Sequence, residues 1–367
     1  MNSKLKTSIA FTLAWIGLAA PEAPGSAFVL PYKTPYSEVY SSPGVVPSRT
    51  RTLLPRGAPV VTSNENGAGW VSLSSPVSGW MLSAEKSPTE PSPLPAPSDS
   101  TTPPPGILLT RDIIYTSGGC VGPLKLDLAR PANPAGPLPA VVVVHGGAWV
   151  GGYKETHIPT AIEFAKNGFV AATIEYRLAP ANPFPAAVED VKCAVRFLRA
   201  NAARYGIDSG RIGAWGWSAG GNLVLLAATT GGDASLEGAG GWSGVSSRLQ
   251  AAVSSGGPTD FVTLGADMTQ YLGGTLAQVP DRYRRASPLT HTGAGDPPML
   301  MTMGTGDWIV SWKQGVTEIQ AMERAGVPGQ LIKVIGGGHA LETRHVPMQP
   351  IHAQQAVIPF CNKYLKR

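Results

Sequence analysis

One serine in this chain lies where a nucleophile could be presented to a substrate. Ser218 is flanked by Gly216 and Gly220, follows the apolar run 211–215 and precedes a second apolar run over 222–228. This pattern predicts a strand, a tight turn that carries the serine, and a helix. In such a turn the serine has a strained backbone, and glycines two positions away prevent collisions between strand and helix. Ser218 is therefore a candidate nucleophile for acyl transfer.

Two groups further along the chain could activate that hydroxyl. A serine attacks an acyl carbon only when a base removes its proton and a third group orients the base. The strand-like run 299–303 leads through a glycine-containing turn to Asp307, and the run 331–335 leads through three glycines to His339. Hydrolases built on a parallel sheet use this order of serine, acid and histidine, each at the carboxyl end of a strand. The order predicts that these residues converge on Ser218.

Other residues compete for the roles of acid and base. His345 and His352 are rival bases, but neither directly follows a predicted strand. Asp260 also follows a strand-like run, and Asp296 precedes two prolines as turn-forming residues do. Asp307 is favoured because its strand comes directly before that of the candidate histidine.

Acyl transfer also requires donors placed for the developing oxyanion. The β-branched run 141–144 predicts a central parallel strand buried on both faces, and it leads directly into the loop 145–149, His-Gly-Gly-Ala-Trp. Two glycines in this loop allow the backbone to approach a ligand closely. Backbone N–H groups of the loop, together with that of Ala219, are candidate oxyanion donors. His145 is interpreted as a residue that shapes the loop through hydrogen bonds.

Three tryptophans border these candidate loops, namely Trp149, Trp217 and Trp308. Each is most simply a residue of the core or of a pocket wall. Because they adjoin the functional loops, we assign them to a candidate substrate pocket, with Trp149 as the one most directly considered for substrate contact.

Four segments together resemble the α/β-hydrolase esterases. They are HGGAW at 145–149, EYRLAP at 175–180, FPAAVED at 184–190 and RIGAWGWSAGGN at 211–222. The segments are most similar to the hormone-sensitive-lipase-like branch and its feruloyl- and acetyl-esterase-like relatives. The resemblance covers roughly residues 107–365.

This resemblance implies an α/β-hydrolase fold, with a mostly parallel sheet and helices on both faces, in the predicted catalytic domain 106–367. The implied catalytic triad is Ser218, Asp307 and His339. The implied oxyanion donors are the N–H groups of Gly146, Gly147 and Ala219. Many relatives have a third glycine where this chain has Ala148, whose methyl group should leave the donors intact but reshape the acyl pocket.

The implied activity is that of a serine carboxylesterase that cleaves short-chain acyl esters through an acyl-enzyme. Acetyl or feruloyl groups on a polysaccharide are one expected substrate class, alongside small-molecule esters. We expect no cofactor and no metal, since the sequence shows no motif for either. An amidase or arylformamidase of the same fold remains open, as does a non-catalytic binding module on a hydrolase scaffold.

The segments before the catalytic domain predict export. Residues 1–27 combine early lysines, a short apolar stretch and a small-residue site, as in a cleaved signal peptide. Alternating β-like pieces predict a small all-β barrel over 35–85 rather than a disordered extension, because their aromatic and β-branched residues need a core. The two Gly-Trp steps resemble a bacterial Src-homology-three-like module, which could bind a cell-wall polymer or another protein. The Pro- and Ser-rich segment 86–105 is interpreted as an extended linker. We therefore expect a secreted or periplasmic protein.

The composition excludes some partners. The formal net charge of +5 comes from interspersed acidic and basic residues, which gives no indication of nucleic-acid binding. The apolar stretch of the signal is shorter than the roughly 20 residues of a membrane span, and no later segment qualifies. Three cysteines allow at most one disulfide; Cys193 is interpreted as buried, and whether Cys120 and Cys361 pair is left open.

Overall fold

The computed structural model describes residues 102–117, 122–341 and 356–366 in full, together with five strands nearer the N-terminus. The chain divides into two compact units, residues 1–95 and 96–367. Each unit is described by itself below.

The first unit contains an antiparallel sheet of five strands in the order β2-β1-β5-β4-β3. The strands are β1 (Tyr36–Tyr40), β2 (Arg51–Pro55), β3 (Val61–Glu65), β4 (Trp70–Ser75) and β5 (Gly79–Leu82). They fall within the predicted module 35–85, whose likeness to a Src-homology-three domain stays a prediction. The predicted signal peptide (1–27) and positions 86–101 of the predicted linker lie outside the described residues.

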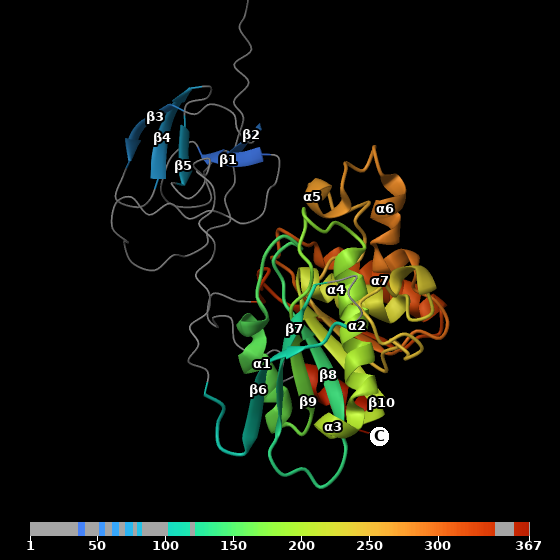
Figure 1. The fold of residues 1–367 in the computed structure, drawn as a ribbon. Helices are drawn as coiled ribbons and strands as arrows, with labels where there is room; N and C mark the ends of the chain where they lie inside the picture. The colour runs from blue at the N-terminus through green and yellow to red at the C-terminus, as the bar shows by residue number, and fades with distance from the viewer. Residues whose placement is uncertain are drawn as a thin grey trace, which may run out of the picture. The chain divides into compact units, whose positions relative to one another are not determined.

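The second unit is built on a twisted sheet of eight strands in the order β13-β12-β11-β10-β8-β9-β7-β6 (Figure 1). Strands β8 to β13 pair in parallel, while β7 pairs antiparallel with both β9 and β6. Their bounds are β6 (Ile107–Ile114), β7 (Lys125–Pro131), β8 (Leu138–Val144), β9 (Val170–Ile174), β10 (Ile207–Trp217), β11 (Ala252–Ser255), β12 (Met299–Gly304) and β13 (Gly329–Val334).

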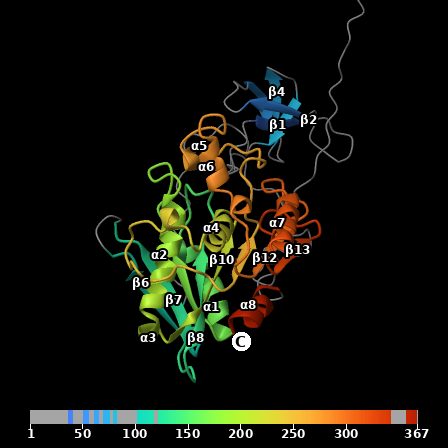
Figure 2. The same cartoon turned by 90° about the vertical axis from the view of Figure 1, so that its right-hand side faces the viewer.

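Helices cover both faces of this sheet (Figure 2). They are α1 (Ile158–Lys166), α2 (Ala186–Ala200), α3 (Ala202–Tyr205), α4 (Ala219–Thr229), α5 (Thr269–Leu272), α6 (Pro280–Arg285), α7 (Trp312–Arg324) and α8 (Ile358–Leu365). Short 3₁₀ helices are η2 (Lys154–His157), η3 (Ala234–Leu236) and η4 (Pro288–Thr290). Among the helices of the described ranges, none combines the length and the apolar character needed to cross a bilayer.

Strand β8 shows why the sheet is a central layer. Its side chains alternate between the two faces, as they must in a strand. Val142 and Val144 join a core with α2, α4 and part of α7, whereas Val141 and Val143 join a second core with α1 and α8. Because both faces are covered by helices, an all-apolar strand is stable here, as predicted from the run 141–144.

One predicted helix is broken in the structure. The sequence predicts a single helix over 187–205, but α2 ends at Ala200 and α3 begins at Ala202. The side-chain amide of Asn201 donates to the carbonyl oxygen of Phe197 at 2.9 Å, and its backbone N–H donates to the same oxygen at 3.0 Å. Asn201 itself has φ −104° and ψ 20°, outside the α-helical region, so α2 ends there and the prediction of one helix is wrong.

Candidate active site

Ser218 lies in the turn between β10 and α4, as its sequence pattern predicts. Its backbone has φ 55° and ψ −118°, in the left-handed half of conformational space that a serine rarely adopts. A Cβ on Gly216 would lie 2.2 Å from the carbonyl oxygen of Gly220, and one on Gly220 would lie 2.2 Å from that of Val144. The Ser218 N–H donates to the carbonyl oxygen of Ser255 at 2.8 Å. Only glycine therefore fits at positions 216 and 220, and the bond to Ser255 fixes the turn to β11.

The structure brings Ser218, His339 and Asp307 together. Nε2 of His339 lies 2.8 Å from Oγ of Ser218, and Nδ1 lies 2.8 Å from Oδ2 of Asp307. The other carboxylate oxygen of Asp307 accepts the N–H groups of Ile309 at 2.8 Å and Val310 at 3.0 Å. All three side chains are buried. Because a carboxylate only accepts, Nδ1 of His339 carries its proton toward Asp307, which leaves Nε2 able to accept the serine proton.

The two competing aspartates make other contacts. Asp260 accepts the N–H of Val262 and the hydroxyl of Thr263, so its carboxylate is used within its own loop. Asp296 accepts the N–H of Gly293. His345 and His352 lie outside the described residues.

The three backbone N–H groups predicted as oxyanion donors have no acceptor among the described residues. In the described part of the chain, the N–H groups of Gly146, Gly147 and Ala219 donate to no protein atom. Ala219 is the first residue of α4, where the N–H groups have no acceptor within the helix. A Cβ on Gly146 would lie 2.7 Å from the ring of Trp217 and 3.1 Å from Cβ of Ser218, so this loop is in close contact with the serine turn.

His145 shapes the loop that carries two of these donors. Its Nδ1–H donates to the carbonyl oxygen of Gly146 at 2.7 Å, and its ring stacks on Tyr176 at 4.2 Å between centroids. The hydroxyl of Tyr176 donates to the carbonyl oxygen of His145 at 3.1 Å. Burial lowers the pKa of His145 to about 4, so the ring is neutral near pH 7 and supports the loop without acting as a cation.

The three predicted pocket tryptophans lie in different environments. Trp149 is only 4% exposed and packs in the core, stacked on Tyr271 at 4.5 Å and edge-on to Phe261 at 5.2 Å. The ring of Trp217 lies 5.6 Å from that of His339, while Trp308 is 50% exposed. The structure favours the core interpretation for Trp149, and substrate contact by the other two stays a prediction.

One supporting residue was not identified from the sequence. Asn222 is fully buried on α4, and its amide donates to the carbonyl oxygens of Pro258 at 3.0 Å and Ala286 at 3.3 Å. These bonds attach the first turn of the serine helix to two loops beyond β11. The sequence feature that could have identified Asn222 is that it is the only polar side chain near the start of an otherwise apolar predicted helix.

The described ranges bear on the predicted metal and cysteine chemistry. Within residues 102–117, 122–341 and 356–366, no group of three or more His, Cys, Asp or Glu side chains is arranged to hold a metal ion. Cys193 and Cys361 are buried free thiols, and Cys120 lies outside the described residues.

Comparisons with known proteins agree on the kind of fold. The family model BD-FAE matches residues 126–322, more than half of the chain. Carboxylesterase NlhH of Mycobacterium tuberculosis is 42% identical over 92 residues, which are 25% of this chain and 29% of that protein. The chain therefore spans less than a third of the length of that curated relative.

Solved structures of esterases are similar over most of their length. A truncated carbohydrate esterase from gut microbiota has a TM-score of 0.62 at 25% identity, covering 71% of this chain and 97% of that one. Esterase Est2 of Thermogutta terrifontis with bound propionate has a TM-score of 0.58 at 27% identity, covering 71% and 94%. Together with the mostly parallel sheet, these matches confirm the predicted α/β-hydrolase fold of the second unit.

Proposed function

Because the chain belongs to the BD-FAE family, we propose that it is a carboxylic ester hydrolase with Ser218 as its nucleophile. The observation that carries the proposal is the chain of hydrogen bonds from Ser218 through His339 to Asp307. The esterase names of the similar relatives and structures support the same activity.

In the proposed first half-reaction, Oγ of Ser218 bonds to the ester carbonyl carbon while its proton passes to Nε2 of His339. Asp307 holds Nδ1–H and stabilises the resulting imidazolium. The carbonyl electron pair moves onto the oxygen, and the free N–H groups of the 146–147 loop and of Ala219 receive this charge. Collapse of the intermediate expels the alcohol, which takes the proton from His339 and leaves the acyl group on Ser218.

The second half-reaction repeats these steps with water. His339 takes a proton from water as the water oxygen bonds to the acyl carbon, and the same backbone donors receive the second oxyanion. The proton then returns from His339 to Oγ of Ser218, and the carboxylic acid leaves. At the end of the cycle, Ser218, His339 and Asp307 have regained the protonation and covalent states in which they began, as catalysis requires.

We further propose short-chain acyl esters as the substrates, including acetyl or feruloyl groups on polysaccharide. The bound propionate of the similar Est2 structure supports a short acyl group, and the similar carbohydrate esterase supports a sugar on the alcohol side. Export through the signal peptide predicted at 1–27, and attachment to a wall polymer through the module predicted at 35–85, belong to the same proposal.

Replacement of Ser218 by alanine tests this function. We expect kcat for p-nitrophenyl acetate to fall by on the order of 10⁴-fold or more, and a fluorophosphonate probe to stop labelling the protein. The exposed Ser209 offers a matched control, and Ser209→Ala should retain both activity and labelling. Undiminished ester turnover by Ser218→Ala would exclude the proposed nucleophile. A panel of esters of rising chain length and of acetylated and feruloylated sugars would then define the substrate.

A further inference from the structure

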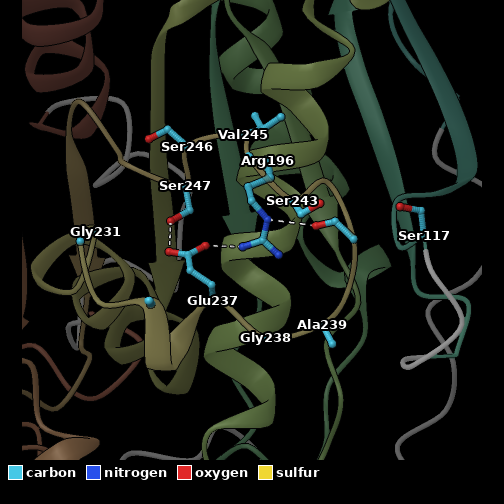
Figure 3. Close-up of a pocket in the computed structure, with 14 residues that line it drawn as sticks. Ser117, Arg196, Gly231, Glu237, Gly238, Ala239, Ser243, Val245, Ser246 and Ser247 are labelled. Carbon is cyan, nitrogen blue, oxygen red and sulfur yellow. Dashed lines mark hydrogen bonds and ion pairs between the residues drawn. The ribbon is translucent and has the colours of Figure 1, made fainter.

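A cavity of about 510 Å³ lies at the end of α4 remote from Ser218 (Figure 3). Its lining begins at Gly231, just after α4, and includes Arg196 of α2 and the loop 237–247. Since α4 has 11 residues and a helix rises about 1.5 Å per residue, roughly 16 Å of helix separate the cavity from the serine turn. The cavity is therefore distinct from the site proposed for ester hydrolysis.

Arg196 contributes the charged donor group that lines this cavity. Its side chain is only 4% exposed. Nε donates to the carbonyl oxygen of Gly241 at 3.1 Å, and Nη1 pairs with the carboxylate of Glu237. Nη2 forms no hydrogen bond with the other residues that line the cavity (Figure 3). A guanidinium nitrogen that no other lining residue occupies can donate to an oxyanion.

The charge around the cavity is unbalanced toward positive. Lys192 and Arg196 are both buried, and both pair with the single carboxylate of Glu237. Burial lowers the pKa of Lys192, while Glu237 and Asp233 oppose this shift. Asp233 and Arg285, which flank the same segment, add one charge of each sign. The five groups together carry a net positive charge.

Hydrogen bonds hold the walls of the cavity in place, and serine hydroxyls lie among its apolar surface. The hydroxyl of Ser247 donates to Glu237 at 2.6 Å, and the thiol of Cys193 donates to the carbonyl oxygen of Gly240 at 3.3 Å, so the loop is fastened over α2. Serine side chains at 117, 243 and 246 also line the cavity. Its volume falls within the roughly 300–1,000 Å³ of small-molecule sites.

We propose that this cavity is a second binding site, for a small hydroxylated oxyanion such as a sugar acid or a sugar phosphate. The carboxylate or phosphate would accept from Nη2 of Arg196 and offset the excess positive charge. The serine hydroxyls would bond the hydroxyl groups of the ligand. The site binds without chemistry, and it does not depend on the proposed ester hydrolysis.

Thermal unfolding titrations of the full chain test the site. D-glucuronate and inorganic phosphate serve as the two anionic probes, with neutral glucose as the control and ionic strength held constant. We expect at least one anion to raise the melting temperature saturably, on the order of 2–4 °C near saturation, while glucose has no effect. A response to phosphate but not to glucuronate would assign the site to phosphate esters, and the reverse would assign it to sugar acids.

Two matched variants locate the response. Ala239 is exposed and lines the cavity, so Ala239→Asp adds a repelling charge there without removing any buried contact. Ala277 is exposed between α5 and α6, and Ala277→Asp adds the same charge elsewhere. We expect Ala239→Asp to weaken anion binding about tenfold or more, which is about 1.4 kcal/mol, and Ala277→Asp to leave it unchanged.

The outcomes separate this inference from the proposed function. The Ser218→Ala protein should show the same titration as the wild type, whatever its activity. The proposal is overturned if no anion stabilises the wild type, if Ala239→Asp binds as tightly as the wild type, or if the response disappears in Ser218→Ala. The last result would place the anion at the serine site.

Discussion

Replacement of Asp307 by asparagine should remove most activity while leaving the fold intact. One oxygen of Asp307 accepts the N–H groups of Ile309 and Val310 at 2.8 and 3.0 Å, and the other accepts Nδ1–H of His339 at 2.8 Å. Asparagine has the same shape, but only one of its two terminal atoms accepts hydrogen bonds. Because two backbone donors face the first position, the amide oxygen must stay there. Its NH₂ group must then face His339.

That orientation reverses the proton arrangement of the histidine. Because Nδ1 of His339 faces an NH₂ donor, it becomes an acceptor, and the ring proton moves to Nε2. The protonated Nε2 can no longer accept the proton of Ser218. We expect kcat to fall by about 10⁴-fold, the loss seen when the aspartate of a serine-protease triad is replaced in this way. This corresponds to about 5.5 kcal/mol of transition-state stabilisation. KM and the melting temperature should change little, because the bonds to Ile309 and Val310 are kept.

The assay is p-nitrophenyl acetate hydrolysis by purified variants over a neutral to alkaline pH series. Asp260→Asn is the matched control, since that carboxylate bonds only Val262 and Thr263 in its own loop. It should retain full activity. A kcat for Asp307→Asn within about tenfold of the wild type, or a larger loss in the control, would refute this account of the acid.

Three further predictions concern stability. Burial raises the pKa of Glu318 to about 7. A carboxyl whose pKa is raised in the folded state contributes stability that is fully present below pH 4.5 and is lost as the pH rises through 7. Between pH 4 and 8, the free energy of unfolding of Glu318→Gln, measured in urea, should therefore rise relative to that of the wild type by up to roughly 3 kcal/mol. A pH-independent difference would contradict this. Gly220→Ala, whose Cβ would lie 2.2 Å from the Val144 carbonyl oxygen, should cost roughly 1–3 kcal/mol, whereas Gly136→Ala, with open space around it, should be neutral. Burial lowers the pKa of His157 to about 3, so the stability that this group contributes above pH 6.5 is lost as the pH falls. At pH 5, His157→Phe should recover roughly 2 kcal/mol of unfolding free energy. Equal acid sensitivity of both proteins would rule out His157 as the source of this loss.

The site was more predictable from the sequence than the edge of the sheet. Ser218, Asp307 and His339 each follow an apolar run and a glycine turn, and these local signals place them at the carboxyl ends of β10, β12 and β13. Their convergence follows from parallel topology. Their catalytic roles remain predictions that the variants above test.

The first strands of the second unit gave no comparable signal. Strands β6, β7 and β9 were not predicted. Strand β9 has only five residues, all buried, and so short an apolar run does not distinguish a strand from a helix segment. Strand β6 alternates between exposed and half-buried residues at the edge of the sheet, where tertiary pairing with β7 decides its conformation. The burial of Trp149 likewise depends on Phe261 and Tyr271, which are distant in the chain.

Backbone strain gives an independent argument about where function lies. In the described ranges, six non-glycine residues have positive φ: Asp112, Ala148, Trp149, Ser218, Trp242 and Leu341. Ala148 and Trp149 follow Gly146 and Gly147, the proposed oxyanion donors; Ser218 is the proposed nucleophile, and Leu341 lies two residues after His339. Such conformations cost on the order of 1–3 kcal/mol each and persist only where surrounding contacts enforce them. Around Ser218, those contacts are the close backbone packing at Gly216 and Gly220 and the hydrogen bond to Ser255. All of them lie within the protein, so none depends on a bound substrate. The strain is therefore already in place in the free protein, so the proposed nucleophile and the proposed oxyanion donors would be oriented before a substrate binds.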